Sequence, residues 1–172
     1  KDMWIHESFG TYMQPLYLEK RQGRKAYQIE MKKNARFVNQ IALAPRQSMD
    51  SHEIYFQNGG SNDIYYKGCW VLHTLRWQMG DEKFFESLRR FCYPTEAARK
   101  ATDGSQCRLV DTDDYVKLCN EIAGEDLGWF FEVYVRQPKL PELRAEFKDG
   151  VLNVHLPKSP TAKPRAIDVK IA

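Results

Sequence analysis

The sequence predicts a mainly α-helical protein that ends in a small β-structure. From the N-terminus to about residue 135, apolar residues recur every three or four positions, which is the spacing of packed helices. After Pro141 they alternate with polar residues around Asp149-Gly150, the pattern of a β-hairpin. We therefore expect a helical domain over residues 1–137 and a β-domain over residues 138–172.

Composition agrees with an ordinary globular chain. The 172 residues are 42% apolar and 28% charged, with a net charge of +3. This length is enough for one sizeable core, or for one domain and part of a second. The small net charge gives no indication of nucleic acid as a partner. No apolar run approaches the roughly 20 residues that span a bilayer.

The cysteines define neither a metal site nor a redox motif. None of the pairs has CxxC spacing, and three of the four lie in apolar helical stretches: Cys69, Cys92 and Cys119, with Cys107 outside them. We expect those three to be free, buried thiols. The cysteines leave the compartment open, so periplasmic, extracellular and cytoplasmic locations all agree with the sequence.

The first predicted helix has an apolar stripe on one side and Glu7 on the other. The stripe consists of Ile5, Phe9, Tyr12, Met13 and Leu16. At about 100° per residue, Glu7 points away from this stripe, and the small Gly10 on its own face leaves room beside the carboxylate. Pro15 is expected to end or kink the helix at residues 12–14. A charged helical segment over 19–40 follows, and we expect Gly23 to separate two helices there.

The middle of the chain predicts a loop and two helices. Residues 41–60 lack helical periodicity and are expected to form the loop. A helix over about 62–79 then buries one face, on which Gly68 allows another helix to approach closely: Ile64, Gly68, Val71, Leu72, Leu75 and Met79. Gly80 is a natural stop, and Asp81 is the expected N-cap of the next helix. That helix ends before Pro94 and packs through Phe84, Phe85, Leu88, Phe91 and Cys92.

The last third of the chain changes from helix to strand. Asp111 or Thr112 is expected to cap a helix that Gly124 closes, with one packed side: Tyr115, Leu118, Cys119 and Ile122. Residues 127–135 are apolar on nearly every side, which indicates a buried helix. A two-residue turn at 149–150 pairs apolar residues across the hairpin: Phe147 with Leu152, Ala145 with Val154, and Leu143 with Leu156. Ile167, Val169 and Ile171 predict a third strand.

Two His-Glu pairs suggest a metal site, but neither completes a two-histidine motif. His6-Glu7 and His52-Glu53 both lack a second histidine four residues after the first, so neither forms HExxH. His52-Glu53 lies in the predicted loop and is interpreted as a solvated pair. Acidic residues interrupt a basic cluster in residues 20–33, so we interpret it as a solvated helix face: Lys20, Arg21, Arg24, Lys25, Lys32 and Lys33.

Three segments, in order along the chain, resemble the aminopeptidase N family of gluzincin-type zinc metallopeptidases. Met3-Trp-Ile-His-Glu-Ser-Phe-Gly-Thr-Tyr12 is similar to the family's segment that supplies the third zinc ligand. Asp63-Ile-Tyr-Tyr-Lys-Gly68 is similar to its Tyr-x-Lys-Gly stretch, whose Tyr is catalytic. The passage from Gly128 to Leu143 is similar to the transition from the helical catalytic domain into a β-sandwich. Matched residue by residue, the resemblance implies Glu7 as a zinc ligand and Tyr65, rather than Tyr66, as the catalytic phenol.

The resemblance also implies a fold, a cofactor and a reaction. It implies the helical C-terminal lobe of a thermolysin-like metallopeptidase domain followed by the start of a small β-sandwich, with Zn²⁺ as cofactor. The parent enzyme would remove N-terminal residues from peptides. The family's HExxH motif, which supplies two histidine ligands and the general base, is expected before Lys1, so this chain alone is expected to be inactive. The sequence indicates neither substrate-binding residues nor the oligomeric state. The alternative is a non-catalytic helical scaffold or interaction module that retains the peptidase fold.

Overall fold

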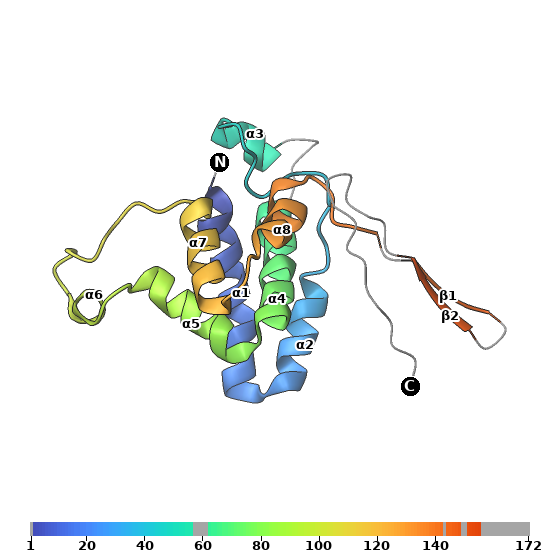
Figure 1. Ribbon diagram of the computed structural model, residues 1–172, viewed down its shortest axis with the longest axis horizontal. Helices are drawn as coiled ribbons and strands as arrows, with labels where there is room; N and C mark the ends of the chain where they lie inside the picture. The colour runs from blue at the N-terminus through green and yellow to red at the C-terminus, as the bar shows by residue number, and fades with distance from the viewer. Residues whose placement is uncertain (1, 57–61, 143, 149–150, 156–172) are drawn as a thin grey trace. The chain divides into compact units, whose positions relative to one another are not determined.

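The chain is mainly α-helical and carries a two-stranded antiparallel sheet near its C-terminus, as the sequence predicts (Figure 1). The computed structural model describes residues 2–56, 62–142, 144–148 and 151–155. It divides into two compact units, Lys1–Leu140 and Pro141–Ala172. In the described part of the chain, no helix is both long and apolar enough to cross a membrane.

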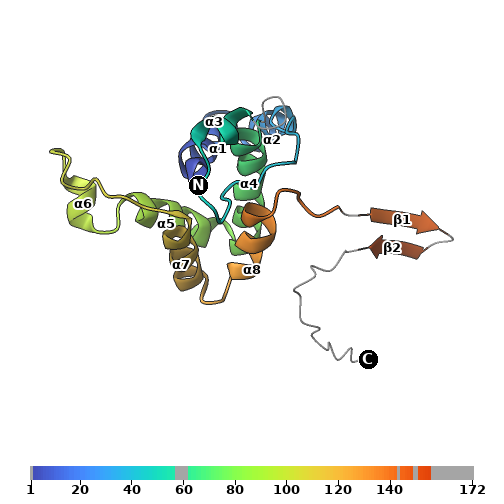
Figure 2. The ribbon, with the colours of Figure 1, turned by 90° about the horizontal axis from the view of Figure 1, so that it is seen from above.

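The first unit is built from helices joined by short and irregular connections. In chain order they are α1 (Met3–Gln22), α2 (Arg24–Lys33), α3 (Ser51–Phe56), the π-helix η2 (Asp63–Lys67), α4 (Gly68–Met79), α5 (Asp81–Cys92), α6 (Glu96–Lys100), α7 (Thr112–Ala123), α8 (Gly128–Phe131) and the π-helix η3 (Glu132–Arg136). Figures 1 and 2 show α1, α2 and α4 side by side, with α5 packed on α7. The short α3 lies near the end of α1 that carries the N-terminus.

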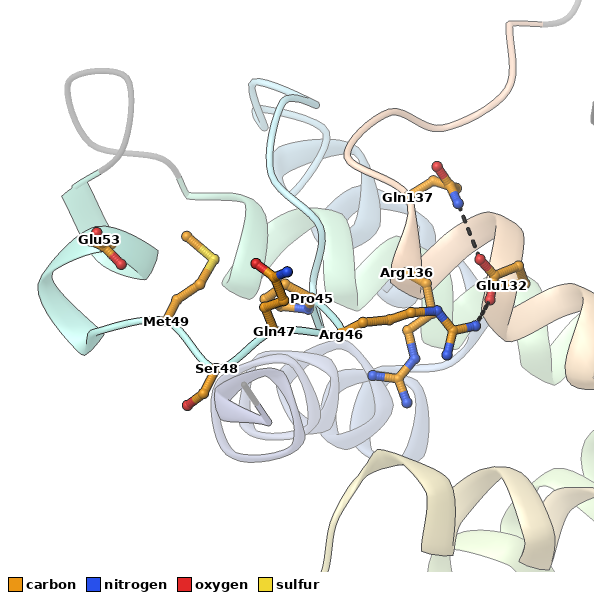
Figure 3. A pocket seen from close by; sticks show the side chains of 9 residues that line it. All are labelled: Pro45, Arg46, Gln47, Ser48, Met49, Glu53, Glu132, Arg136 and Gln137. Atoms are coloured by element: carbon orange, nitrogen blue, oxygen red, sulfur yellow. Dashed lines mark hydrogen bonds and ion pairs between the residues drawn. The ribbon is translucent and has the colours of Figure 1, made fainter.

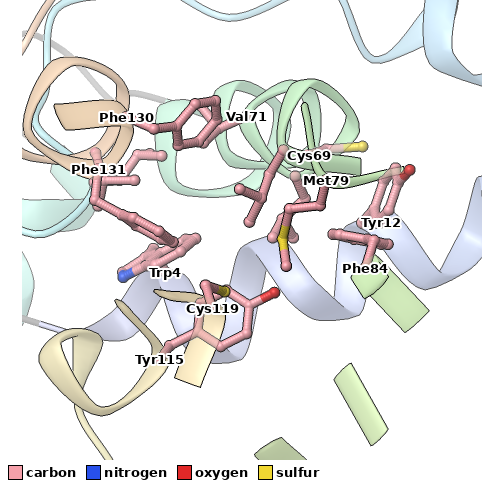
Figure 4. Close-up of a cluster of buried hydrophobic side chains, with 14 of the residues drawn as sticks. Trp4, Tyr12, Cys69, Val71, Met79, Phe84, Tyr115, Cys119, Phe130 and Phe131 are labelled. Atoms are coloured by element: carbon pink, nitrogen blue, oxygen red, sulfur yellow. The ribbon is translucent and has the colours of Figure 1, made fainter. Parts of the chain in front are cut away.

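An aromatic core joins α1, α4, α5, α7 and α8 (Figure 4). Tyr115 of α7 lies fully buried within it, and three rings from other helices contact it at centroid distances of 4.8, 5.2 and 5.9 Å: Phe91, Phe9 and Phe131. Trp4 is also fully buried, and its indole N–H donates to the Thr112 hydroxyl at 2.8 Å. Burying one such side chain stabilises the fold by roughly 1.5–3 kcal/mol, so this cluster fixes how the helices pack.

Of the two outcomes expected at Pro15, an end of the first helix is wrong, and a kink stays a prediction. Helix α1 continues to Gln22 with Pro15 buried inside it. A proline removes one helical hydrogen bond, and tertiary contacts on both sides outweigh that local cost. The Tyr12 hydroxyl hydrogen-bonds the Tyr27 hydroxyl at 2.9 Å, and the Glu19 carboxylate accepts from Arg76 at 2.6 Å. The predicted break at Gly23 is confirmed, with φ at 86°.

The prediction of a loop over residues 41–60 is wrong in part. Residues 51–56 form α3, and the stretch before it is packed against the helices, with three apolar side chains buried: Ile41, Leu43 and Ala44. Asp63 holds the start of this stretch, because its carboxylate accepts backbone N–H groups from all four residues of 38–41, at 2.8–3.0 Å. Residues 58–60, the predicted end of the loop, lie outside the described residues.

The remaining helix boundaries follow the sequence closely, with one exception. The buried face predicted for residues 62–79 is confirmed, and its first turns form η2. Asp111 caps α7 through a capping box, and Gly124 closes that helix with φ at 74°. Asp81 does not cap α5, because both its carboxylate oxygens accept from Arg76, at 2.7 and 2.8 Å. Gly80 occupies the N-cap position instead.

Two residues that the sequence predicts on packed helix faces are partly exposed to solvent. Met13 is 41% exposed and Phe85 is 40% exposed. The buried side of α1 is centred on Trp4, Ser8 and Tyr12 instead, because α4 packs against the helix at Ser8. The expected buried thiols are confirmed at Cys69 and Cys119, whereas Cys92 is exposed; the cysteines described are all free.

The hairpin forms most of the described part of the second unit. Strands β1 (Arg144–Lys148) and β2 (Val151–His155) pair antiparallel. The predicted register is confirmed for the pairs that are described: Ala145 with Val154, and Phe147 with Leu152. The pair of 143 with 156, the turn at 149–150 and the third strand over 167–171 lie outside the described residues.

Candidate functional site

The two residues singled out by the resemblance lie in one cluster. Glu7 belongs to the second turn of α1, and Tyr65 belongs to η2, directly before α4. The charge of the Glu7 carboxylate, and hydrogen bonding to it, raise the pKa of the Tyr65 phenol. The Glu7 side chain is 18% exposed, and Tyr65 is half-buried, so solvent still reaches the cluster.

A close contact between α1 and the start of α4 sets this pairing. The Ser8 hydroxyl donates to the Ile64 carbonyl at 2.6 Å, and both residues are buried. A Cβ atom added to Gly68 would lie only 1.8 Å from the Ser8 Oγ. The approach therefore requires glycine at this position. Since Ser8 follows Glu7 and Ile64 precedes Tyr65, the contact also fixes the position of the carboxylate relative to the phenol.

A third residue, Tyr55 of α3, joins them. Its hydroxyl donates to Glu7 Oε1 at 2.7 Å, and its ring centroid lies 6.3 Å from that of Tyr65. We call these three residues the Glu7–Tyr55–Tyr65 cluster. Sequence reasoning missed Tyr55, because α3 lies in a segment without helical periodicity. The only signal was a short apolar run over residues 54–56, too short to define a helix.

The electrostatics of the cluster keep both phenols protonated. Burial, followed by the charge of Glu7, raises the pKa of Tyr65 above its ordinary value. Burial and the hydrogen bond to Glu7 raise the pKa of Tyr55 in the same direction. Both hydroxyls therefore act as hydrogen-bond donors at neutral pH. Within the described part of the chain, the only ion-pair partner of Glu7 is His6, at 3.4 Å, whose side chain is 80% exposed.

The residues around Tyr65 anchor η2 to neighbouring segments. Lys67 is fully buried, and its ammonium group donates to the Ile41 and Pro138 carbonyls, both at 2.8 Å. Burial lowers the pKa of Lys67 to about 8, although the charge of Asp63 opposes the shift. Tyr66 instead packs under the Arg36 guanidinium, 4.5 Å from its ring centroid. Short π-helical segments such as η2 occur frequently at functional sites.

The donor set fits one side of a metal site. Glu7 offers a carboxylate oxygen, and its orientation is held by a hydrogen bond, as is common for ligating carboxylates. A Cβ added to Gly10, on the same side of α1, would meet nothing within 4 Å, so the space beside that face is open. No group of three His, Cys, Asp or Glu side chains gathers among the residues that the structure describes. Because catalytic zinc takes three protein ligands, Glu7 can be only one of them.

The other His-Glu pair and the basic cluster are solvated. His52 and Glu53 are exposed, although they lie on α3 and not in the predicted loop. All six cations of the basic cluster are exposed as well, and acidic neighbours pair with some of them. Arg24 contacts Glu19 at 2.7 Å, and Lys33 contacts Glu30 at 2.8 Å.

A polar pocket lies along the segment that leads into α3 (Figure 3). Its volume is about 570 Å³, and its charged lining has both signs: Arg46, Glu53, Glu132 and Arg136. The two guanidinium groups already have acidic partners, Arg46 with Glu132 and Arg136 with Asp113. The pocket is therefore balanced in charge and does not select for an anion or a cation.

A separate polar network crosses the core between α1, α2 and α4. The Tyr27 hydroxyl hydrogen-bonds the Tyr12 hydroxyl at 2.9 Å and His73 Nδ1 at 2.5 Å. Burial lowers the pKa of His73, and the charges of Arg24 and Arg76 lower it further. The network satisfies buried polar groups and has no direct contact with Glu7 among those described.

Comparisons of the chain with protein-family models, curated proteins and solved structures found no match. The indications of function are therefore the three sequence segments and the geometry of the Glu7–Tyr55–Tyr65 cluster. Chemically, the cluster combines a carboxylate that can bind a cation with two neutral hydroxyl donors. Such donors stabilise negative charge that develops on a substrate oxygen.

Proposed function

We propose that this chain is the C-terminal part of the catalytic domain of a zinc aminopeptidase similar to the aminopeptidase N family, together with the start of its β-domain. One observation supports the proposal above all others. Glu7 and Tyr65 are singled out from two distant segments of the sequence, and both contact Tyr55, at 2.7 Å from its hydroxyl and 6.3 Å between ring centroids respectively. A chance similarity in two segments gives no reason for their key residues to meet.

Glu7 has the role of a zinc ligand in this proposal. Its carboxylate is partly exposed, is held by the Tyr55 hydroxyl and has no Lys or Arg partner in the described part of the chain. The negative charge is therefore available to a cation. The other ligands, two histidines of an HExxH motif, would come from residues outside this chain. When bound, zinc supplies the Lewis acid that activates water and polarises a peptide carbonyl.

Tyr65 has the role of a donor to the substrate. A tyrosine hydroxyl has an ordinary pKa of about 10, so the phenol keeps its proton throughout the neutral range. It can therefore donate a hydrogen bond to the carbonyl oxygen of the scissile peptide as negative charge develops there. Removing one such donor typically costs about 10²–10³ in rate. Tyr66 faces Arg36 and has no part in this step.

The test uses the full-length parent protein and three variants. Glu7→Gln should abolish zinc retention, measured as bound zinc per protein after dialysis. Tyr65→Phe should retain zinc but lower kcat for an aminoacyl substrate by about 10²–10³. Tyr66→Phe is the matched control, and it should leave both quantities unchanged. Stoichiometric zinc in Glu7→Gln would refute the ligand assignment.

A further inference from the structure

We infer that Tyr55 is a positioning residue, which orients the Glu7 carboxylate for the metal and holds the Tyr65 ring in place. The inference rests on the proposed function, and it assigns a role to α3, a segment that the resemblance leaves without one. It follows from two contacts made by different parts of the same side chain. The hydroxyl donates to Glu7 Oε1 at 2.7 Å, and the ring packs on Tyr65 with the planes 45° apart.

The hydroxyl contact restricts the carboxylate. Glu7 lies on a helix, with three side-chain torsions between its backbone and the carboxylate, so the group needs an external partner to hold one orientation. Within α1, the Thr11 hydroxyl donates to the Glu7 backbone carbonyl at 2.8 Å, so this contact does not hold the carboxylate. Tyr55 reaches the carboxylate itself, from a different segment of the chain.

The chemistry of the donor suits a ligand that must remain negatively charged. A phenol forms a hydrogen bond without adding a positive charge, whereas a lysine or arginine would neutralise the carboxylate and compete with a metal ion. Outer partners of this kind orient metal ligands, and their loss typically weakens metal binding by about 10–100-fold.

The ring of Tyr55 connects Glu7, the proposed zinc ligand, with Tyr65, the proposed hydrogen-bond donor to the substrate. Tyr65 lies in the π-helix η2, and Ser8 of α1 hydrogen-bonds the backbone of this segment at Ile64. Its side chain has the Tyr55 ring beside it. One side chain of α3 therefore contacts both residues of the proposed machinery, so displacement of α3 would disturb zinc affinity and turnover together.

The experiment separates the hydroxyl from the ring in the full-length parent. Tyr55→Phe deletes the hydroxyl and keeps the ring, and zinc affinity is measured by competition with a chelator of known affinity. We expect zinc binding to weaken by about 10–100-fold. The melting temperature of the metal-free protein should change little, because the hydroxyl lies at a partly exposed site. Tyr55→Leu removes the ring as well, and should lower kcat at saturating zinc below that of Tyr55→Phe.

The matched control is Tyr66→Phe, which removes the hydroxyl of the residue next to Tyr65, a hydroxyl that accepts a hydrogen bond from Arg36. If Tyr55→Phe binds zinc as tightly as this control while Glu7→Gln loses zinc, the inference is wrong and the proposed function stands. If Glu7→Gln itself retains stoichiometric zinc, the proposed function fails first. Equal kcat for Tyr55→Leu and Tyr55→Phe at saturating zinc would refute the role of the ring.

Discussion

A methyl group added at Gly68 would test the contact that brings Glu7 beside Tyr65. In Gly68→Ala, the new Cβ would lie 1.8 Å from the Ser8 Oγ and 2.4 Å from the Ser8 Cβ. Rotating the Ser8 hydroxyl away relieves only the first clash, so α1 has to move away from α4. The hydrogen bond from Ser8 to the Ile64 carbonyl, at 2.6 Å, would then be lost.

The expected magnitude combines three effects. Overpacking a buried contact costs about 1–3 kcal/mol. Losing one buried hydrogen bond costs about 1 kcal/mol more. Alanine favours the helix over glycine by roughly 1 kcal/mol, which offsets part of the loss. We therefore expect Gly68→Ala to lower the free energy of unfolding by about 2 kcal/mol.

Urea unfolding followed by far-UV circular dichroism measures this change, and Gly10→Ala is the matched control. A Cβ at Gly10 meets nothing within 4 Å, so that variant should gain up to about 1 kcal/mol from helix propensity alone. In the double variant Ser8→Gly/Gly68→Ala, the nearest remaining Ser8 atom is Cα at 3.5 Å, an ordinary contact. A coupling of about 3 kcal/mol is expected between the two sites, because the clash and the hydrogen bond both require Ser8. If Gly68→Ala matches Gly10→Ala in stability, the contact does not exist as described.

Three further predictions concern ionisable groups in the helical unit. Asp63→Asn leaves one neutral amide oxygen for the four N–H groups of residues 38–41. It should cost about 3 kcal/mol in urea unfolding, since hydrogen bonds to charged groups contribute about 1.5–3 kcal/mol each. An unchanged midpoint would contradict this prediction. The pKa of Lys67 is lowered from 10.5 to about 8 in the folded chain. Between these two pH values the unfolded chain therefore binds more protons than the folded chain. Stability should therefore rise with pH from about 8, and Lys67→Met should abolish the rise in thermal melts. His73 also has a lowered pKa, so stability should fall as the pH drops below about 6.5, and His73→Gln should flatten that slope; equal slopes in both proteins would refute it.

Much of the helical architecture could be predicted because its signals are local. The cap at Asp111, the stop at Gly124 and the buried face of residues 62–79 depend on neighbours within one or two helical turns. The hairpin register follows from alternation around a short turn, and its described pairs are confirmed. Pro15 was misjudged for the same reason, because the local rule omits the contacts of Tyr12 and Glu19 that hold the helix beyond it.

The candidate site shows where local reasoning ends. The sequence by itself determined that Glu7 lies off the apolar stripe of α1 and that a glycine follows the Tyr-Tyr-Lys stretch, since both depend only on residue type and spacing. Only the tertiary structure brought Glu7 and Tyr65 together and added Tyr55. The physical reason is that each contact joins segments far apart in the chain, and the periodicity of one segment does not encode which other segment packs against it.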